Sequence, residues 1–235
     1  MKKFLTILIL FTSSCAFAQS FQQTQGFQQR RNVQHAASGQ SALRINVYAT
    51  YAFDDNHVDS YYSNTSYFNG AVNGGFQYGG GLEYLAFPNK GLEISYLRLD
   101  SKAPMTYYTL TGDKRTNFDM AHNYIFIGAN QYFKVNPKVE PFAGFQIGMA
   151  VYNIQNPENG NSHGTTKFAW GAKTGVNIWA TEKVGIKIQA ALLSAVQAVG
   201  GGVYFGTGGT GAGISGYSTF YQFSLGGGLV FNLGN

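Results

Sequence analysis

Cysteine is nearly absent from this sequence, and charge is scarce. The one cysteine, Cys15, lies inside an expected signal peptide, so we expect no disulfide and no thiol chemistry in the mature chain. Charged residues make up 11% of the chain, against about 25% in a typical soluble domain. A soluble barrel has to cover its exterior with charge and a lipid-facing barrel does not, so this shortage favours a membrane protein.

Long apolar runs are also missing. No stretch beyond the N-terminal segment approaches the roughly 20 apolar residues that a membrane-spanning helix needs. A soluble fold or a membrane β-barrel therefore remains. The net charge is +5, and without Lys2 and Lys3 the chain keeps 14 basic and 11 acidic residues. This small surplus is not gathered into a basic patch, which argues against nucleic acid as a partner.

The N-terminus has the three parts of an export signal. Lys2-Lys3 is a positive segment, residues 4–11 are apolar, and Ala16-Phe17-Ala18 has the small-x-small pattern of a cleavage site. We therefore predict a signal peptide over residues 1–18, with cleavage before Gln19. Lipid attachment at Cys15 is the alternative that this segment leaves open.

Residues 19–42 are rich in Gln and Ser and have little apolar periodicity. We interpret this segment as a disordered periplasmic leader. A single domain is expected over residues 43–235, because the remaining length suits one domain.

From Leu43 onward, apolar and polar residues alternate with a period of two, which indicates strands with one apolar face. Both faces of the segment 121–133 are apolar, so the sequence leaves its inward face open. The eight predicted strands are 43–53, 76–87, 92–99, 121–133, 141–153, 166–180, 184–192 and 219–233.

The connections between these strands alternate between long and short. Residues 54–75, 100–117, 155–164 and 197–216 are long connections, and residues 88–90, 134–140 and 181–182 are short ones. Outer-membrane barrels have long external loops and short periplasmic turns. We therefore predict an all-β fold, an eight-stranded antiparallel up-and-down transmembrane β-barrel in the cell outer membrane. A soluble calycin-like barrel, with its apolar face inward, is the rival fold.

The expected inward face of the barrel carries charge. Isolated burial of charge is costly, so these groups must pair or be hydrated. One hypothesis is a plug of Glu–Lys pairs in the lumen; the other is a narrow polar conduit, or a gate made by those pairs. The candidate lumen residues are Glu83, Glu93, Lys173, Lys187 and Gln189.

No catalytic constellation is apparent in the sequence. His122, near Asp119, is the one histidine expected at a strand end, and no G-x-S-x-G motif accompanies it. Metal-ligand spacings and phosphate-binding loops are missing as well. We therefore predict no catalytic residues, no metal site and no cofactor.

Three segments resemble the broad outer-membrane β-barrel family, which includes OmpA-type transmembrane domains and opacity-like porins. They are residues 78–85 (YGGGLEYL), 141–148 (PFAGFQIG) and 223–231 (FSLGGGLVF). The resemblance covers roughly residues 43–233 and implies a barrel architecture, not an activity. OmpA-type proteins often continue into a peptidoglycan-binding domain; this chain ends two residues after Leu233, so that role is not expected.

Three functions remain open. The first is a non-enzymatic barrel with a structural or adhesin-like surface role, carried by the aromatic residues of its long loops at Tyr61-Tyr62, Tyr67-Phe68 and Tyr107-Tyr108. The second is a narrow porin-like channel for small solutes, and the third is a lipid-modifying enzyme using His122. The expected partners are outer-membrane lipid and extracellular or host surface ligands, and we expect a monomer.

Overall fold

The computed structural model describes residues 42–54, 61–63, 66–109, 112–196, 202–206, 209–213 and 220–234. The predicted signal peptide and the leader up to Ser41 lie outside this set. Throughout the described ranges the regular elements are strands, and no helix there is long and apolar enough to cross a membrane.

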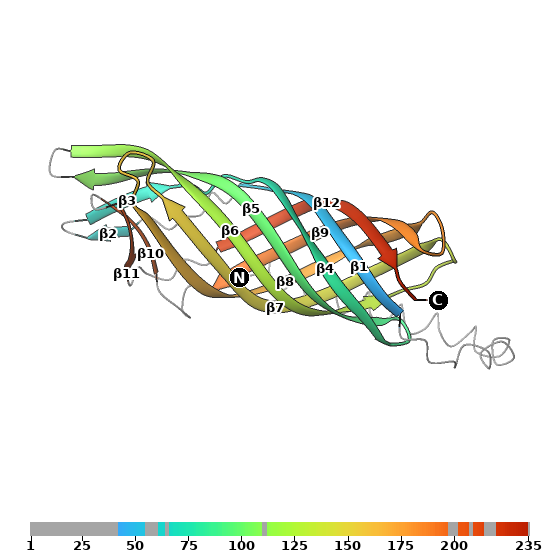
Figure 1. Ribbon diagram of the computed structural model, residues 1–235. Coiled ribbons are helices and arrows are strands. Elements are labelled where there is room, and N and C mark those ends of the chain that lie inside the picture. The colour runs from blue at the N-terminus through green and yellow to red at the C-terminus, as the bar shows by residue number, and fades with distance from the viewer. Residues whose placement is uncertain are drawn as a thin grey trace, which may run out of the picture. The chain divides into compact units, whose positions relative to one another are not determined.

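Eight long strands form one closed antiparallel barrel (Figure 1). They are β1 (Ala42–Ala52), β4 (Gly75–Phe87), β5 (Lys90–Thr109), β6 (Gly112–Tyr132), β7 (Val139–Gln155), β8 (Ser162–Trp179), β9 (Val184–Val196) and β12 (Phe220–Asn232). Each pairs with the next barrel strand along the chain, and β12 returns to pair with β1. The predicted eight-stranded up-and-down barrel is confirmed.

The short turns mark the periplasmic end of the barrel. Phe87 pairs with Lys90, so only Pro88 and Asn89 connect β4 to β5. Asn89 has φ 62°, a left-handed conformation that asparagine tolerates better than most residues. The first and last barrel strands begin and end at this same end, where Arg44 pairs with Asn232.

One predicted loop is wrong. Residues 100–117 were expected to be a long connection, but β5 and β6 stay paired from Lys90↔Gln131 to Thr109↔Gly112. The ribbon persists because its inner side is apolar: Ala103, Met105 and Phe118 are all fully buried. Beyond the barrel, β5 and β6 also provide hydrogen-bond partners for each other's backbone N–H and C=O groups.

Four short strands lie at the outer end, away from the C-terminus (Figure 1). They are β2 (Tyr61–Ser63), β3 (Ser66–Gly70), β10 (Gly202–Gly206) and β11 (Gly209–Gly213). β2 and β3 form a hairpin that pairs with β5, while β10 and β11 pair with each other. The predicted long connections 54–75 and 197–216 therefore contain short hairpins.

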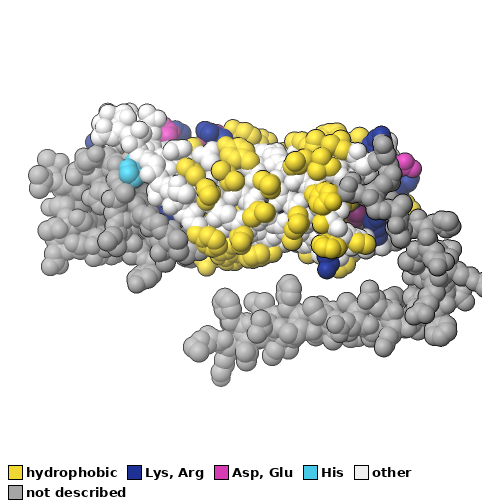
Figure 2. All heavy atoms as spheres, turned by 60° about the horizontal axis from the view of Figure 1, so that its bottom comes forward, with side chains coloured by type: hydrophobic (Ala, Val, Ile, Leu, Met, Phe, Trp, Pro, Cys, Tyr) yellow, Lys and Arg dark blue, Asp and Glu magenta, His cyan; other side chains and the backbone are white. Residues whose placement is uncertain are grey.

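The barrel exterior is apolar. Large hydrophobic side chains on all eight barrel strands are exposed, among them Leu82, Ile94 and Ile127. Figure 2 shows hydrophobic side chains over the middle of the visible face, with charged side chains gathered toward its two ends. An apolar band flanked by charge is the pattern of a barrel embedded in a bilayer, and it excludes the soluble calycin-like alternative.

A lysine in this band should destabilise the barrel in lipid. We predict that Ile94→Lys lowers the free energy of unfolding in phosphatidylcholine vesicles by about 2–4 kcal/mol, because the ammonium is forced into hydrocarbon. Ile94 is 61% exposed and pairs with Leu82 and Ile127. Urea titration followed by tryptophan fluorescence measures the change.

Val135→Lys is the matched control, because Val135 is 69% exposed but lies in the turn between β6 and β7. Its effect should stay within about 0.5 kcal/mol, as for an ordinary surface change. Equal effects of the two lysines would contradict a lipid-facing position for Ile94.

Candidate functional site

The lumen holds the candidate site. All five predicted lumen residues are buried: Glu83 on β4, Glu93 on β5, Lys173 on β8, and Lys187 and Gln189 on β9. Four of the five are charged and lie in the half of the barrel nearer the periplasm, where the side chains of several strands converge. We call these four the charged layer: Glu83, Glu93, Lys173 and Lys187.

Two of these residues form a carboxylate pair. Glu83 and Glu93 are direct cross-strand partners, an arrangement that destabilises a sheet when both carry the same charge. Two asparagine side chains offset this repulsion. The Nδ2 of Asn130 lies 2.8 Å from Glu83 and 3.0 Å from Glu93, and the Nδ2 of Asn46 lies 3.4 Å and 3.0 Å from the same carboxylates. Each amide therefore donates to both glutamates.

Further donors complete the carboxylate pair. The hydroxyl of Tyr132 donates to Glu83 at 2.6 Å. Glu93 accepts hydrogen bonds from Tyr48 and Lys173, and it forms a buried ion pair with Lys173. Among the described residues, the expected Glu–Lys pairing is therefore present at Glu93, whereas neutral donors hold Glu83.

Two glycines make room for the carboxylates. A Cβ at Gly91 would lie 2.0 Å from Oε1 of Glu83, and a Cβ at Gly81 would lie 2.3 Å from Oε1 of Glu93. Each glutamate therefore packs over a glycine of the opposite strand. Larger residues at these positions would displace side chains that are already fixed by several hydrogen bonds.

Lys187 and Gln189 lack hydrogen bonds of this kind. The Nζ of Lys187 and the Oε1 of Gln189 have no hydrogen-bond partner within the described part of the chain. The Lys187 ammonium lies 4.5 Å from the ring centroid of Phe142 and 5.7 Å from that of Tyr48. These cation–π contacts offset part of its desolvation. A buried ammonium without an acceptor otherwise requires water.

A second buried ion pair was missed from the sequence. Two guanidinium nitrogens of Arg44 donate to Glu140 at 2.9 Å and 3.2 Å. The Arg44 guanidinium also lies 4.8 Å from the ring centroid of Tyr132 and 5.0 Å from that of Trp179. The period-two pattern could have found Arg44, since it shares a face with Asn46 two residues later.

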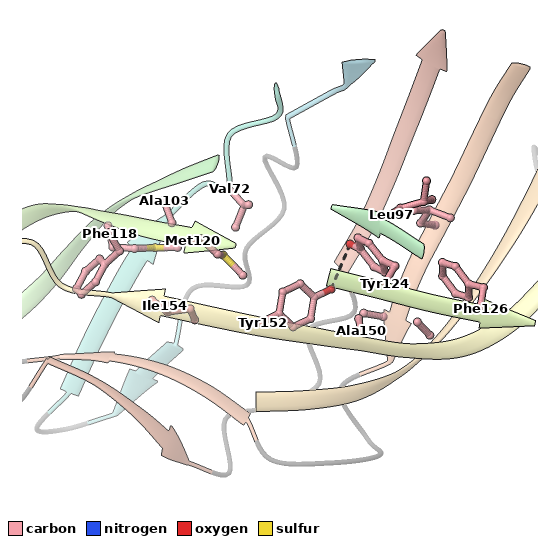
Figure 3. Packing of buried hydrophobic residues seen from close by; sticks show 14 of the residues in the cluster. Val72, Leu97, Ala103, Phe118, Met120, Tyr124, Phe126, Ala150, Tyr152 and Ile154 are labelled. Carbon is pink, nitrogen blue, oxygen red and sulfur yellow. Dashed lines mark hydrogen bonds between the residues drawn. The ribbon is translucent and has the colours of Figure 1, made fainter. Parts of the chain in front are cut away.

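The outer half of the lumen is aromatic and apolar. The inward face of β6, open in the sequence, carries Tyr124 and Phe126 in mid-barrel and Phe118 and Met120 farther out, all buried. Figure 3 shows the hydroxyls of Tyr124 and Tyr152 turned toward each other, 3.4 Å apart. The lumen therefore changes along its length from mainly charged to mainly aromatic and apolar. Lys167 on β8 is nevertheless buried in the same row as Tyr124 and Ala150.

His122 lies within the aromatic part of the lumen, between Met120 and Tyr124 on the inward face of β6. It is buried, its Nε2 is 3.0 Å from Oγ of Ser101, and its ring packs edge-on against Tyr152. Its Nδ1 has no hydrogen-bond partner in the described ranges. Asp119, its neighbour in sequence, instead binds Lys102 at 2.6 Å. No carboxylate in the described structure therefore orients this imidazole, as a catalytic triad requires.

The described residues also contain no group of three or more His, Cys, Asp or Glu side chains placed to hold a metal ion. In the charged layer, Glu83 and Glu93 bind side chains of the protein itself.

Comparisons with known proteins agree on the architecture. No protein-family model matches the chain, and no curated protein matches its sequence. The crystal structure of Neisserial surface protein A matches with a TM-score of 0.53 at 14% identity, covering 81% of this chain and 97% of that one.

Two further outer-membrane proteins match less well. The N-terminal β-barrel domain of Pseudomonas aeruginosa OprF has a TM-score of 0.42 at 16% identity, covering 83% of this chain and 98% of that one. Ail, the attachment invasion locus protein of Yersinia pestis, has a TM-score of 0.43 at 12% identity, covering 82% and 99%.

The closed barrel, its apolar exterior and its polar lumen define the class of the protein. It is a transmembrane β-barrel of the Gram-negative outer membrane. Within that class it has the eight-stranded up-and-down fold shared with Neisserial surface protein A.

Breaking the buried ion pair between Glu93 and Lys173 should destabilise the barrel strongly. We predict that Glu93→Gln lowers the free energy of unfolding by about 3–5 kcal/mol, because it leaves the buried ammonium of Lys173 without a counter-ion. Adding Lys173→Met should recover part of that loss. Urea unfolding in vesicles measures both variants.

Asp119→Asn serves as the control, since its ion pair with Lys102 is about half exposed. It should change stability by less than about 1 kcal/mol. A Glu93→Gln variant no less stable than Asp119→Asn would contradict the description of a closely coupled buried pair.

Proposed function

We propose that this protein is a non-enzymatic surface-contact protein of the outer membrane, acting in an adhesin-like way through its outer end. The observation that carries the proposal is the backbone register there. Tyr61 pairs with Phe68, and Phe68 pairs in turn with Tyr107, which aligns three aromatic residues across β2, β3 and β5. Tyr62 and Tyr67 are also partners. Aromatic residues are the usual anchors of protein contacts.

Side-chain contacts at the outer end also join β6 to the turn between β7 and β8. Oγ1 of Thr116 donates to Glu158 at 2.7 Å, and Lys114 forms an ion pair with the same carboxylate. These hydrogen bonds, from Lys114 first, hold the pKa of Glu158 below its usual range. The start of β6 is thereby tied to the turn between β7 and β8. A surface ordered before contact loses less entropy on binding.

The filled lumen supports a contact role over transport. Its periplasmic half contains the buried ion pairs Arg44–Glu140 and Lys173–Glu93, and its outer half contains buried aromatic and apolar side chains. Small barrels are commonly filled in this way. Since the described barrel strands are all paired on both sides, the barrel needs no second copy to protect a sheet edge, and we propose that it acts as a monomer.

Cell adhesion tests the surface role. Cells displaying the triple variant Tyr61→Ser, Phe68→Ser, Tyr107→Ser should adhere to epithelial monolayers at least about fivefold less than cells displaying the wild type, since loss of an aromatic anchor costs more than about 1 kcal/mol. The control is Asp113→Ala, Arg115→Ala, which removes two exposed charges from the same end, leaves the Lys114–Glu158 ion pair in place and should leave adhesion unchanged. Unchanged adhesion of the aromatic variant, at equal surface display, would refute the proposal.

A narrow channel is the second candidate, and one observation favours it. Polar atoms without a hydrogen-bond partner in the described ranges occur at several heights in the lumen, including Arg44 Nε, Lys187 Nζ and Ser194 Oγ. Such atoms require water, and a continuous line of waters would carry small ions.

Single-channel recording separates the two candidates. The filled lumen predicts no steady conductance from the purified protein. A steady current that falls on neutralising Lys173, with Lys173→Gln, would support the channel. The enzymatic alternative is tested in parallel: we expect His122→Ala to leave the lipid A profile of expressing cells unchanged, because no acid among the described residues orients His122.

A further inference from the structure

The outer wall of the barrel shows where its apolar surface ends. Tyr96, Ile125, Met149 and Phe168 form one row across β5, β6, β7 and β8, and each is at least 40% exposed. In the next outward-facing row of these strands Val151 is the one apolar residue, beside Arg98, Asn123 and Thr166. The outward-facing row after that consists of Asp100, Ala121, Asn153 and Gly164 and has no large apolar side chain. The row from Tyr96 to Phe168 is therefore the outer limit of the apolar band on this side.

A hollow of about 490 Å³ lies directly beyond that limit. Its lining includes the small side chain of Ala121 on β6, which lies in one row with Asn153 on β7. Its charged and amide lining consists of Arg98, Asp100, Lys102, Asp119, Asn153 and Gln155.

The charges of the hollow are arranged in two neutral pairs. Arg98 binds Asp100 through two nitrogens at 2.7 Å and 3.0 Å, and Lys102 binds Asp119 at 2.6 Å. A free anion would have to displace a carboxylate from its cation. A hydroxyl group can donate to a carboxylate while it accepts from the neighbouring cation, so both pairs stay intact.

Uncharged groups extend the same chemistry. Asn153 lies in the row of Ala121, and Gln155 and Ser162 are paired in the outward-facing row beyond it. All three are exposed, and each can both donate and accept a hydrogen bond. Alternating donors and acceptors around a shallow, neutral hollow suit the closely spaced hydroxyls of a sugar.

We propose that this hollow binds the headgroup sugar of an outer-leaflet glycolipid. The position of the hollow favours a lipid-linked sugar over a free one. The hollow lies on the outward wall of the barrel, adjoining the apolar row, so a lipid whose chains lie along Ile125 and Met149 places its headgroup there. This site is separate from the aromatic residues at the outer end, and it does not depend on the surface-contact function.

Lipid retention tests the site. The full chain is refolded into phosphatidylcholine vesicles that contain either rough lipopolysaccharide or phosphatidylglycerol, extracted in mild detergent, and its bound lipid is measured by native mass spectrometry. Ala121→Phe fills the hollow. Ala129→Phe is the matched control, since Ala129 also faces outward on β6 but lies in the apolar band.

The double variant Asn153→Ala, Gln155→Ala removes hydrogen-bonding groups without adding bulk, so the test does not depend on Ala121→Phe folding. Wild type and Ala129→Phe should retain lipopolysaccharide, while Ala121→Phe and the double variant should retain at least about fivefold less, a difference near 1 kcal/mol. Phosphatidylglycerol should not be retained by any of them.

Three results would overturn the proposal. Equal retention of lipopolysaccharide by the wild type and by both hollow variants would show that the hollow does not bind it. If the wild type retained phosphatidylglycerol as well as it retains lipopolysaccharide, the interaction would be a nonspecific attraction to anionic lipid. If the deacylated oligosaccharide bound from solution as tightly as the lipid, the assignment to a membrane lipid would be wrong and the hollow would be a soluble-glycan site.

Discussion

The pairing of the first barrel strand with the last is the constraint on which the rest of this structure depends. β1 and β12 join along Arg44–Ala52 and Ser224–Asn232 and close the sheet. In hydrocarbon an unpaired backbone group costs several kcal/mol, so an open sheet could not remain in the bilayer. In a closed barrel, successive residues of each strand face the lipid and the lumen in turn. The apolar band and the charged lumen are two results of that one alternation.

The lumen shows how a barrel without space for a separate core stabilises itself. Near the periplasm it uses charge, with Glu83 and Glu93 held by shared asparagines and by Lys173. Farther out it uses aromatic and apolar packing around Tyr124 and Tyr152. Filling the interior in both ways leaves the outer end and the outer wall as the surfaces available for partners. The proposed contact function and the proposed glycolipid site lie on those two surfaces.

Much of the fold could be predicted because the barrel pattern is local: alternation in each strand and connection lengths between strands. The five lumen residues followed from the same alternation. Four features could not be obtained this way. The inward face of β6 was ambiguous because both faces are apolar, the ribbon at residues 100–117 contains Pro104 and polar residues typical of a loop, and the pairing of Arg44 with Glu140 joins residues 96 apart. The wall hollow needs the register of four strands, which no local pattern contains.

Heat-modifiability of the protein extracted from membranes tests the central claim, that this chain is a closed barrel embedded in the outer membrane. The protein is located by cell fractionation and then run on gels with and without boiling. A closed, fully hydrogen-bonded barrel resists the detergent until it is boiled, so we expect the protein in the outer-membrane fraction with a clear shift in mobility. A protein released with the soluble periplasm, and running identically with and without boiling, would contradict the account.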